Sequence, residues 1–80
     1  MNENEILQRL TNIFRQIFSD PTIVATPQMT AADVEKWDSL THIDMIMLVE
    51  EQFAIRLPTL ELMGMQNVGD LVRMIRGKVP

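Results

Sequence analysis

Residues 38–42, Asp-Ser-Leu-Thr-His, carry the side chains most suited to covalent or acid–base chemistry in the chain. Asp38 precedes a strongly apolar stretch and is a favoured N-cap residue, because its carboxylate can accept free backbone N–H groups of a first helical turn. With Asp38 as the cap, Ser39 has no structural role and its hydroxyl faces water. A free serine at a helix start suits a phosphate group, since exposed N–H groups and the helix dipole favour an anion there.

His42 offers Ser39 a second chemistry, that of a serine–histidine pair, because residues three apart on a helix are neighbours. A triad also needs an orienting acid, an oxyanion hole and a substrate pocket, and the sequence indicates none of them. We therefore predict no catalytic residue and expect His42 to be a neutral packing residue. Trp37 would pack back on it as a hydrophobic staple. A minimal Ser–His hydrolase is therefore the third and least favoured functional interpretation, after the two given at the end of this section.

Composition narrows the remaining chemistry. The 80 residues include no cysteine, so the chain has no disulfide, thiolate metal site or thiol nucleophile, and thioester chemistry must take its sulfur from a cofactor. Asp38 with Asp44, and Glu50 with Glu51, supply carboxylates but not at the spacing of a cation-binding loop, so no metal site is expected. The length predicts one domain over residues 1–80. The absence of a signal peptide and of a long apolar run predicts a cytoplasmic protein.

An all-α fold is expected. Apolar residues at helical spacing predict a packing helix over residues 5–18, which Pro21 ends. Residues 19–37 show no sustained periodicity and predict a long loop, in which Thr30–Asp33 form one helical turn capped by Thr30. The side chains expected to pin this loop onto the core are Ile23, Val24, Met29 and Val34.

Residues 39–53 predict the central helix. It is apolar around much of its circumference, so its charges orient it, with Asp44 and Glu51 on one side and Glu50 nearby. Leu40 and Met47 are then exposed among carboxylates, which predicts a partner-docking surface made of Leu40, Asp44, Met47, Glu50 and Glu51. The alternative is that Leu40 and Met47 pack under the first loop. The side chains assigned to the core are His42, Met45, Ile46, Val49 and Phe53.

Two short helices complete the predicted fold. Residues 54–58 are too few and too mixed for a helix, and Thr59 is expected to cap a short one that Gly64 stops. Asn67 caps the last helix and Gly77 ends it. The residues of this helix that face inward are Val68, Leu71, Val72 and Ile75.

The negative charge is concentrated around Ser39. Residues 33–51 hold six acidic residues against one basic residue, Lys36, a local charge of −5 that leaves +1 for the rest of the net −4. Such a patch repels nucleic acid and steers basic partners toward the site. The alternative is an ordinary solvated helix face.

The stretch Asp38-Ser39-Leu40, followed by an apolar helix that ends in Glu50–Phe53, resembles the attachment site of acyl carrier proteins. The likeness extends over nearly the whole chain: its length, the long first loop, residues 55–58 and the last helix. It implies a small four-helix carrier bundle with a long first loop and a short third helix. By this resemblance, Ser39 would hold a covalent 4'-phosphopantetheine arm derived from coenzyme A, with Asp38 as the helix cap beside it and His42 near the arm.

The resemblance implies transport without catalysis. A phosphopantetheinyl transferase, with Mg²⁺ of its own, would attach the arm to Ser39. An acyl- or aminoacyl-loading ligase would charge the thiol, and downstream acyl-processing enzymes would receive the thioester. Association is expected to be weak and electrostatically assisted, because the carrier must also leave. A monomer that binds neither nucleic acid nor membrane is expected.

The cargo stays open at this stage. Carriers of primary fatty-acid synthesis typically have glycine and alanine before the Asp and an acid soon after the Leu, whereas this chain has Glu35-Lys36-Trp37 and Thr41-His42 there. The departure favours a free-standing carrier of a specialised pathway over one of primary fatty-acid synthesis, acting on polyketide, modified acyl or aminoacyl groups. Fatty acyl, polyketide and aminoacyl cargo all stay open. An aminoacyl or peptidyl carrier is an alternative. An alternative of another class is a helical adaptor domain in which Ser39 is unmodified.

Overall fold

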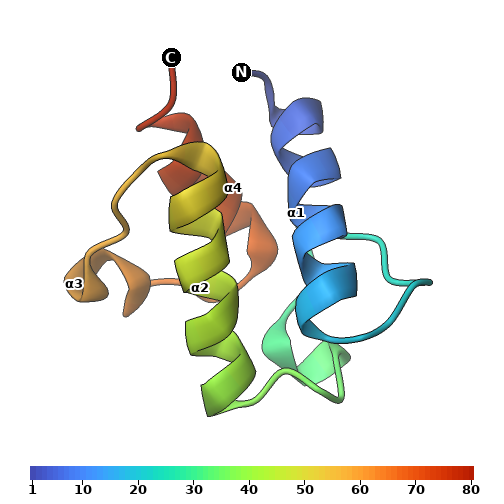
Figure 1. The fold of residues 1–80 in the computed structure, drawn as a ribbon. Coiled ribbons are helices and arrows are strands. Elements are labelled where there is room, and N and C mark those ends of the chain that lie inside the picture. The colour runs from blue at the N-terminus through green and yellow to red at the C-terminus, as the bar shows by residue number, and fades with distance from the viewer.

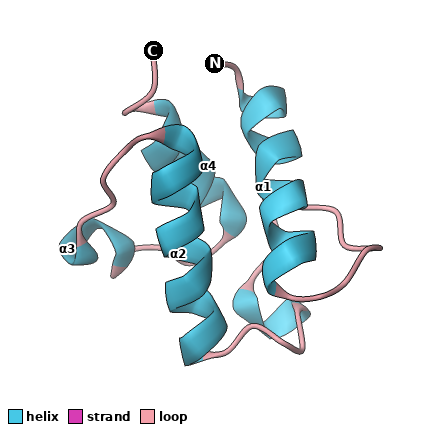
Figure 2. Ribbon diagram, in the orientation of Figure 1, coloured by secondary structure: helices cyan, strands magenta, loops and turns pink.

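The computed structural model describes residues 1–80, and every regular element in it is a helix (Figure 2). The helices α1, α2 and α4 stand side by side, α3 lies on the outer side of α2, and the two termini meet at one end (Figure 1). The predicted all-α fold with four helices is confirmed. No helix has the length and apolar character needed to cross a membrane. The elements are α1 (Glu3–Ile17), the 3₁₀ turn η1 (Ala31–Asp33), α2 (Ser39–Phe53), α3 (Thr59–Leu62) and α4 (Val68–Arg76).

Helix α1 begins two residues earlier than predicted because Asn2 caps it. The Asn2 Oδ1 atom accepts the backbone N–H of Glu5 at 2.9 Å, and the Glu5 carboxylate lies 3.5 Å from the backbone N–H of Asn2. This reciprocal pair satisfies amides that would otherwise be free at the helix start. Two of the apolar residues at helical spacing in this segment, Leu7 and Ile17, are only partly buried. The buried residues of α1 are Ile6, Leu10, Ile13 and Phe14.

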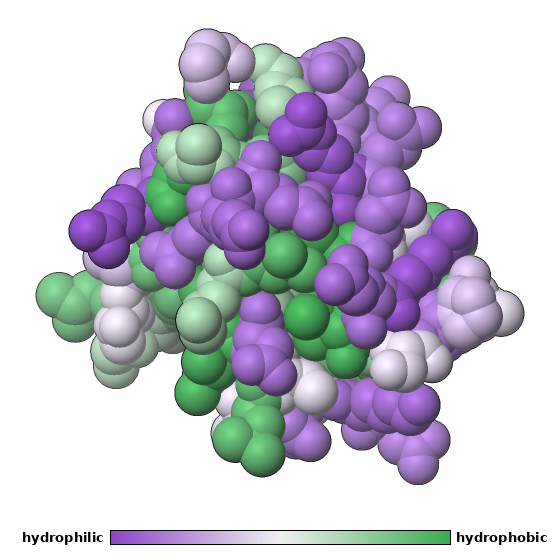
Figure 3. Space-filling view, viewed as in Figure 1, coloured by the Kyte–Doolittle hydropathy of each residue, from purple (hydrophilic) through white to green (hydrophobic).

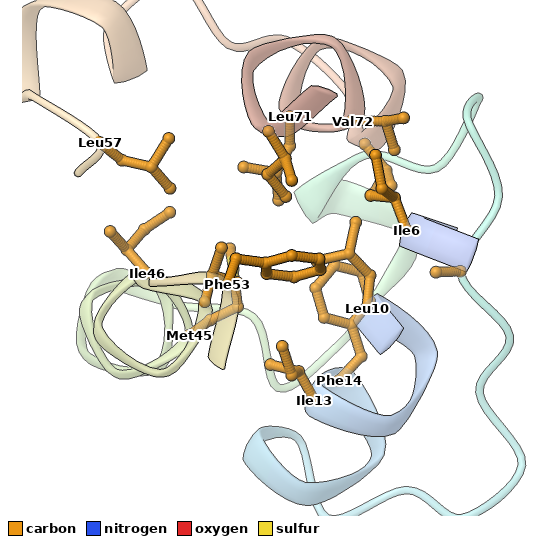
Figure 4. Packing of buried hydrophobic residues seen from close by; sticks show 14 of the residues in the cluster. Ile6, Leu10, Ile13, Phe14, Met45, Ile46, Phe53, Leu57, Leu71 and Val72 are labelled. Carbon is orange, nitrogen blue, oxygen red and sulfur yellow. The ribbon is translucent and has the colours of Figure 1, made fainter. Parts of the chain in front are cut away.

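One apolar core joins α1, α2 and α4, and it contains no buried polar residue. Figure 4 shows side chains from these three helices pointing toward one another, with Leu57 from the segment before α3 close to Ile46 of α2. Burying a large aliphatic or aromatic side chain contributes about 1.5–3 kcal/mol, so this cluster is the main source of stability. The inward residues predicted for α4 and four of the five predicted for α2 are buried, and His42 is half-buried.

The long loop is tied to α1 through polar side chains. Thr11 Oγ1 accepts the backbone N–H of Ala25 at 3.0 Å, and Arg15 Nε donates to the carbonyl of Ile23 at 2.8 Å. Ile23 and Ala25 are buried, whereas the intervening Val24 is 57% exposed, so its predicted pinning role is wrong. Successive residues of an extended segment point to opposite sides, which turns Val24 outward.

The second half of the loop is tied to α4 and to its own helical turn. The first amides of α4 donate to the loop, from Val68 to the Met29 carbonyl at 2.8 Å and from Gly69 to the Pro27 carbonyl at 2.9 Å. A Cβ on Gly69 would lie 3.0 Å from that Pro27 oxygen, so the close approach needs glycine. The predicted turn is present as η1, in which the Asp33 carboxylate accepts the Thr30 backbone N–H at 2.9 Å. Met29 and Val34 pack partly against the core.

The last two helices follow the predicted order with one shift. Pro58 rather than Thr59 precedes α3, so Thr59 is its first residue and the predicted cap was wrong by one position. Proline fixes a φ suited to helix entry, and here no side chain caps α3. Asn67 caps α4 as predicted, since its Oδ1 accepts the Asp70 N–H at 2.9 Å, and the helix ends before Gly77.

Ala54, which ends α2, has a φ of 53° in the left-handed region. A side chain destabilises this conformation, so Ala54→Gly should raise the free energy of unfolding by about 0.5–1 kcal/mol. Urea unfolding followed by far-UV circular dichroism measures the change. Ala32→Gly is the matched control, because Ala32 is also exposed but has a negative φ, and it should be neutral or destabilising. Equal destabilisation by both substitutions would contradict the prediction.

Candidate functional site

Asp38 caps α2 through a reciprocal network. Its Oδ1 atom accepts the backbone N–H groups of Leu40 and Thr41, both at 2.9 Å, while Thr41 Oγ1 accepts the Asp38 N–H at 2.8 Å. The hydrogen bonds from the Thr41 and Leu40 amides hold the pKa of the Asp38 carboxyl below its usual range. The predicted cap is confirmed, and α2 covers the predicted residues 39–53.

Ser39 is exposed in the first turn of α2, and neither its hydroxyl nor its backbone N–H has a hydrogen-bond partner. Because Asp38 occupies the Leu40 and Thr41 amides, the free first-turn donor is the Ser39 N–H alone, which is less than the several free donors the sequence suggested. The open hydroxyl and this adjacent donor fit a covalently attached phosphate, whose anionic oxygens also favour the helix start.

Trp37 and His42 contact each other at the start of α2. The indole Nε1–H donates to His42 Nδ1 at 3.0 Å, and the two rings lie 6.1 Å apart with a 22° angle between their planes. The Trp37 ring is buried against Phe14 and Phe18, at centroid distances of 5.4 and 5.1 Å. The expected staple is confirmed, but its hydrogen bond could not be read from apolar patterning. His42 thus faces Trp37, and no hydrogen bond joins it to Ser39.

The outer side of α2 exposes apolar side chains among acids. Leu40 is 75% and Met47 61% exposed, so they do not pack under the first loop, and Ile43, which the sequence reasoning missed, is 56% exposed. Figure 3 shows hydrophobic side chains at the surface along α2 and at α3, between hydrophilic ones. Asp44 and Glu51 are exposed as well.

Glu50 differs from the other acids of the predicted docking surface. Its carboxylate accepts the backbone N–H of Leu57 at 2.8 Å, and its side chain is half-buried. The Leu57 side chain is buried, so this hydrogen bond anchors the segment between α2 and α3. Glu50 therefore serves the fold, and the exposed charge of this surface comes mainly from Asp44 and Glu51.

A cleft of about 1000 Å³ lies between α2 and the segment that includes α3. His42 lines it at the end of α2 near Ser39, whereas Glu50 and Arg56 line it near the other end of α2. This cleft could not be predicted from the sequence, because its walls depend on where α3 packs. The apolar lining residues are Ile43, Ile46, Met47, Leu57, Leu62 and Met63.

Comparison with known proteins gives consistent similarities. A family model described as "Phosphopantetheine attachment site" matches residues 8–75. The acyl carrier protein of Thermosynechococcus vestitus is 34% identical over 80 residues, covering 99% of this chain and 98% of the relative. A meromycolate extension acyl carrier protein of Mycolicibacterium aurum is 25% identical, covering 94% and 77%. The solution NMR structure of a holo acyl carrier protein from Geobacter metallireducens superimposes with a TM-score of 0.85 at 42% identity, covering 90% of this chain and 83% of that one.

The hydrogen-bond pattern predicts that the cap and the free hydroxyl can be separated by mutation. Asp38→Ala should lower the free energy of unfolding, because it removes an acceptor for two helix-start amides. Ser39→Ala should change it by less than about 0.5 kcal/mol, as for other exposed surface positions. Urea unfolding at neutral pH measures both. A larger loss for Ser39→Ala would mean that the serine is itself the cap.

The same cap has a defined pH dependence. A carboxyl whose pKa is depressed on folding stabilises the protein above its unfolded-state pKa, near 3.8, and this contribution is lost as the pH falls through the lower folded-state value. Asp38→Asn retains an acceptor that does not titrate, so its stability should fall less steeply below about pH 4 than that of the wild type. Some slope should remain, because the pKa values of Asp20 and Asp70 are also lowered. Parallel curves would contradict the prediction.

Proposed function

The chain belongs to the acyl carrier proteins, the family of the phosphopantetheine attachment site, and we propose that Ser39 is the residue to which its arm is joined. As a member of this family it is a carrier of acyl groups and not a catalyst. Its cofactor is covalently attached 4'-phosphopantetheine. When bound, the cofactor supplies the thiol that holds the acyl group as a thioester.

The single observation that carries this assignment is the exposed Ser39 hydroxyl, left without a partner at the start of α2. Asp38 performs the capping that a serine at this point would otherwise perform, so substitution of the hydroxyl leaves the helix start intact. The chain has one other serine, Ser19, which follows the end of α1 and opens no helix. The helix-start location therefore favours Ser39.

The cleft beside α2 favours a cargo with an apolar chain. It begins at His42, one helical turn from Ser39, and its lining is mostly apolar. Apolar surface removed from water contributes roughly 25 cal/mol per Å², so an acyl chain gains more there than a polar aminoacyl group does. We therefore assign the carrier to acyl cargo rather than aminoacyl cargo. The adaptor alternative has no observation in its favour.

We propose a specialised acyl pathway for this carrier. The residues that flank the Asp38–Leu40 motif support this choice. Trp37 stands where primary fatty-acid carriers typically have a small residue, and it pairs with His42 in the stretch after Leu40 where they typically have an acid. One similar protein is named for meromycolate extension. The proposal includes a monomeric carrier, since a single chain closes its own core, and a cytoplasmic location where coenzyme A supplies the arm.

Carriers of this family work with a phosphopantetheinyl transferase and acyl-processing enzymes. For this chain we propose that such partners, including a loading ligase, dock on the outer side of α2. Leu40 and Met47 would enter apolar pockets of the partner, while Asp44 and Glu51 meet a basic rim. Ile43 extends the apolar part, and Glu50 contributes less because Leu57 engages it.

Intact-mass analysis after incubation with coenzyme A and a broad-specificity transferase tests the attachment residue. The wild type should gain one phosphopantetheine, and Ser39→Ala should gain none. Ser19→Ala is the matched control and should gain the arm like the wild type. Modification of Ser39→Ala, or loss of modification in Ser19→Ala alone, would show that the arm is attached elsewhere. No gain in any protein with several transferases would favour the adaptor interpretation.

Transferase kinetics at several ionic strengths test the docking surface. Asp44→Lys and Glu51→Lys should each lower kcat/KM by about threefold to tenfold at low salt, because a rim charge acts mainly on association. Added salt should slow the wild type more than these variants, since screening removes what they already lack. Met47→Ala should slow modification with little salt dependence, as expected for an apolar contact.

Glu3→Lys is the control for net charge, because it makes the same charge change at the N-terminal end of α1. This end lies at the other end of the molecule from the start of α2 (Figure 1). It should leave kcat/KM close to that of the wild type. Equal rates and parallel salt curves for all variants would mean that the acidic residues of α2 form only a solvated face.

A further inference from the structure

The bond between Trp37 and His42 fixes which nitrogen of the imidazole carries the proton. An indole N–H can only donate, so the atom 3.0 Å from it must be an acceptor, and His42 Nδ1 is therefore unprotonated. A neutral imidazole with a free Nδ1 carries its proton on Nε2. No hydrogen bond to this Nε2–H is present in the structure. Since no side-chain nitrogen or oxygen is buried without a partner, His42 presents this donor to solvent.

The indole that fixes the imidazole is itself held by the core. Trp37 is buried and contacts the rings of Phe14 and Phe18. The backbone of His42 is fixed too, because its N–H donates to the Asp38 carbonyl at 2.9 Å in the first turn of α2. The Nδ1 side of the ring faces this core, so the Nε2 side faces away from it. His42 is half-buried and lines the cleft, so this other side meets the accessible surface.

His42 lies three residues after Ser39 on α2, so the two side chains share one side of the helix start. Residues three apart on a helix are neighbours, and helical side chains lean toward the N-terminus. The His42 ring therefore lies over the turn that Ser39 opens. The Nε2–H is not buried, so without the arm it is open to water at the mouth of the apolar cleft, where an arm joined to Ser39 can reach it.

We propose that His42 Nε2–H donates a hydrogen bond to an oxygen of the arm on Ser39 and directs the arm toward the cleft between α2 and α3. Trp37 acts as the positioning residue, because it selects the tautomer. The acceptor is a phosphodiester oxygen or the carbonyl oxygen of an arm amide, since both are strong acceptors within the first part of the arm. This inference rests on the proposed attachment at Ser39.

NMR of ¹⁵N-histidine-labelled protein before and after loading tests the donor directly. The unloaded protein should show one tautomer, with Nε2 protonated and Nδ1 free. After loading, which intact mass verifies, the Nε2–H proton should shift downfield and exchange with water more slowly. A loaded protein with an unchanged Nε2–H signal would overturn this inference alone. A protein that gains no arm would overturn it together with the proposed function.

Substitutions separate positioning from packing and identify the acceptor. Trp37→Phe keeps the aromatic packing but removes the donor, so His42 should populate both tautomers and lose the loading-dependent shift. His42→Gln, which retains an N–H donor, should keep the arm signals closer to those of the wild type than His42→Leu does. If the phosphodiester is the acceptor, its ³¹P signal moves in loaded His42→Leu; if an amide is, the arm's amide carbonyl signal moves. If neither signal moves, the proposal is wrong, and this holds even where Trp37→Phe fails to fold.

Discussion

The packing of one indole ring determines where the start of α2 lies, and with it the proposed attachment residue Ser39. Trp37 packs against the tilted rings of Phe14 and Phe18 in the α1 region and donates its N–H to His42 of α2, so it joins the end of the long loop to two helices. Each aromatic contact is worth about 0.5–1.5 kcal/mol beyond burial, and the hydrogen bond adds about 1 kcal/mol. Because Trp37 points inward one residue before the cap, Asp38 closes the helix start and Ser39 points outward. A rigid anchor and an accessible hydroxyl are therefore two residues apart.

Helix α2 has to satisfy two opposing demands. It buries Met45, Val49 and Phe53 in the core, yet it leaves Leu40 and Met47 largely in water. A helix that is apolar around most of its circumference is normally buried all round, so the exposed pair is not explained by folding. Their neighbours Asp44 and Glu51 are charged and exposed, so they keep this surface hydrated. For the docking surface proposed above, this arrangement suits brief contacts with several partners, because apolar anchors give affinity and charges raise the association rate.

The helix ends that depend on local hydrogen bonds could be predicted from the sequence. Features that depend on contacts between distant parts of the chain could not. Asp38 and Asn67 cap their helices through atoms two or three residues away, so α2 and α4 could be delimited from the sequence. Asn2 with Glu5 has the same local signature and could have been found in that way. Val24 was misplaced because the direction of the loop depends on bonds to α1 and α4, which are distant in sequence. The cleft was missed for the same reason, since α2 forms one of its walls and the segment that includes α3 forms the other. The contact between Trp37 and His42 could be predicted, but the hydrogen bond between their rings depends on geometry that the sequence does not contain.

The two walls of the cleft differ in stability, and this difference suits the work of a carrier. The α2 wall belongs to the buried core, whereas α3 has four residues, none of them buried. A single helical turn is unstable by itself, so neighbouring contacts hold α3 in place, among them the buried Leu57 before it and the exposed pair Lys78–Glu61 at 3.1 Å. An exposed ion pair contributes only about 0–1 kcal/mol. Displacement of α3 therefore costs far less than opening the core. Under the proposed function, this lets the cleft adapt to acyl chains of different length while Ser39, at the start of α2, keeps its position.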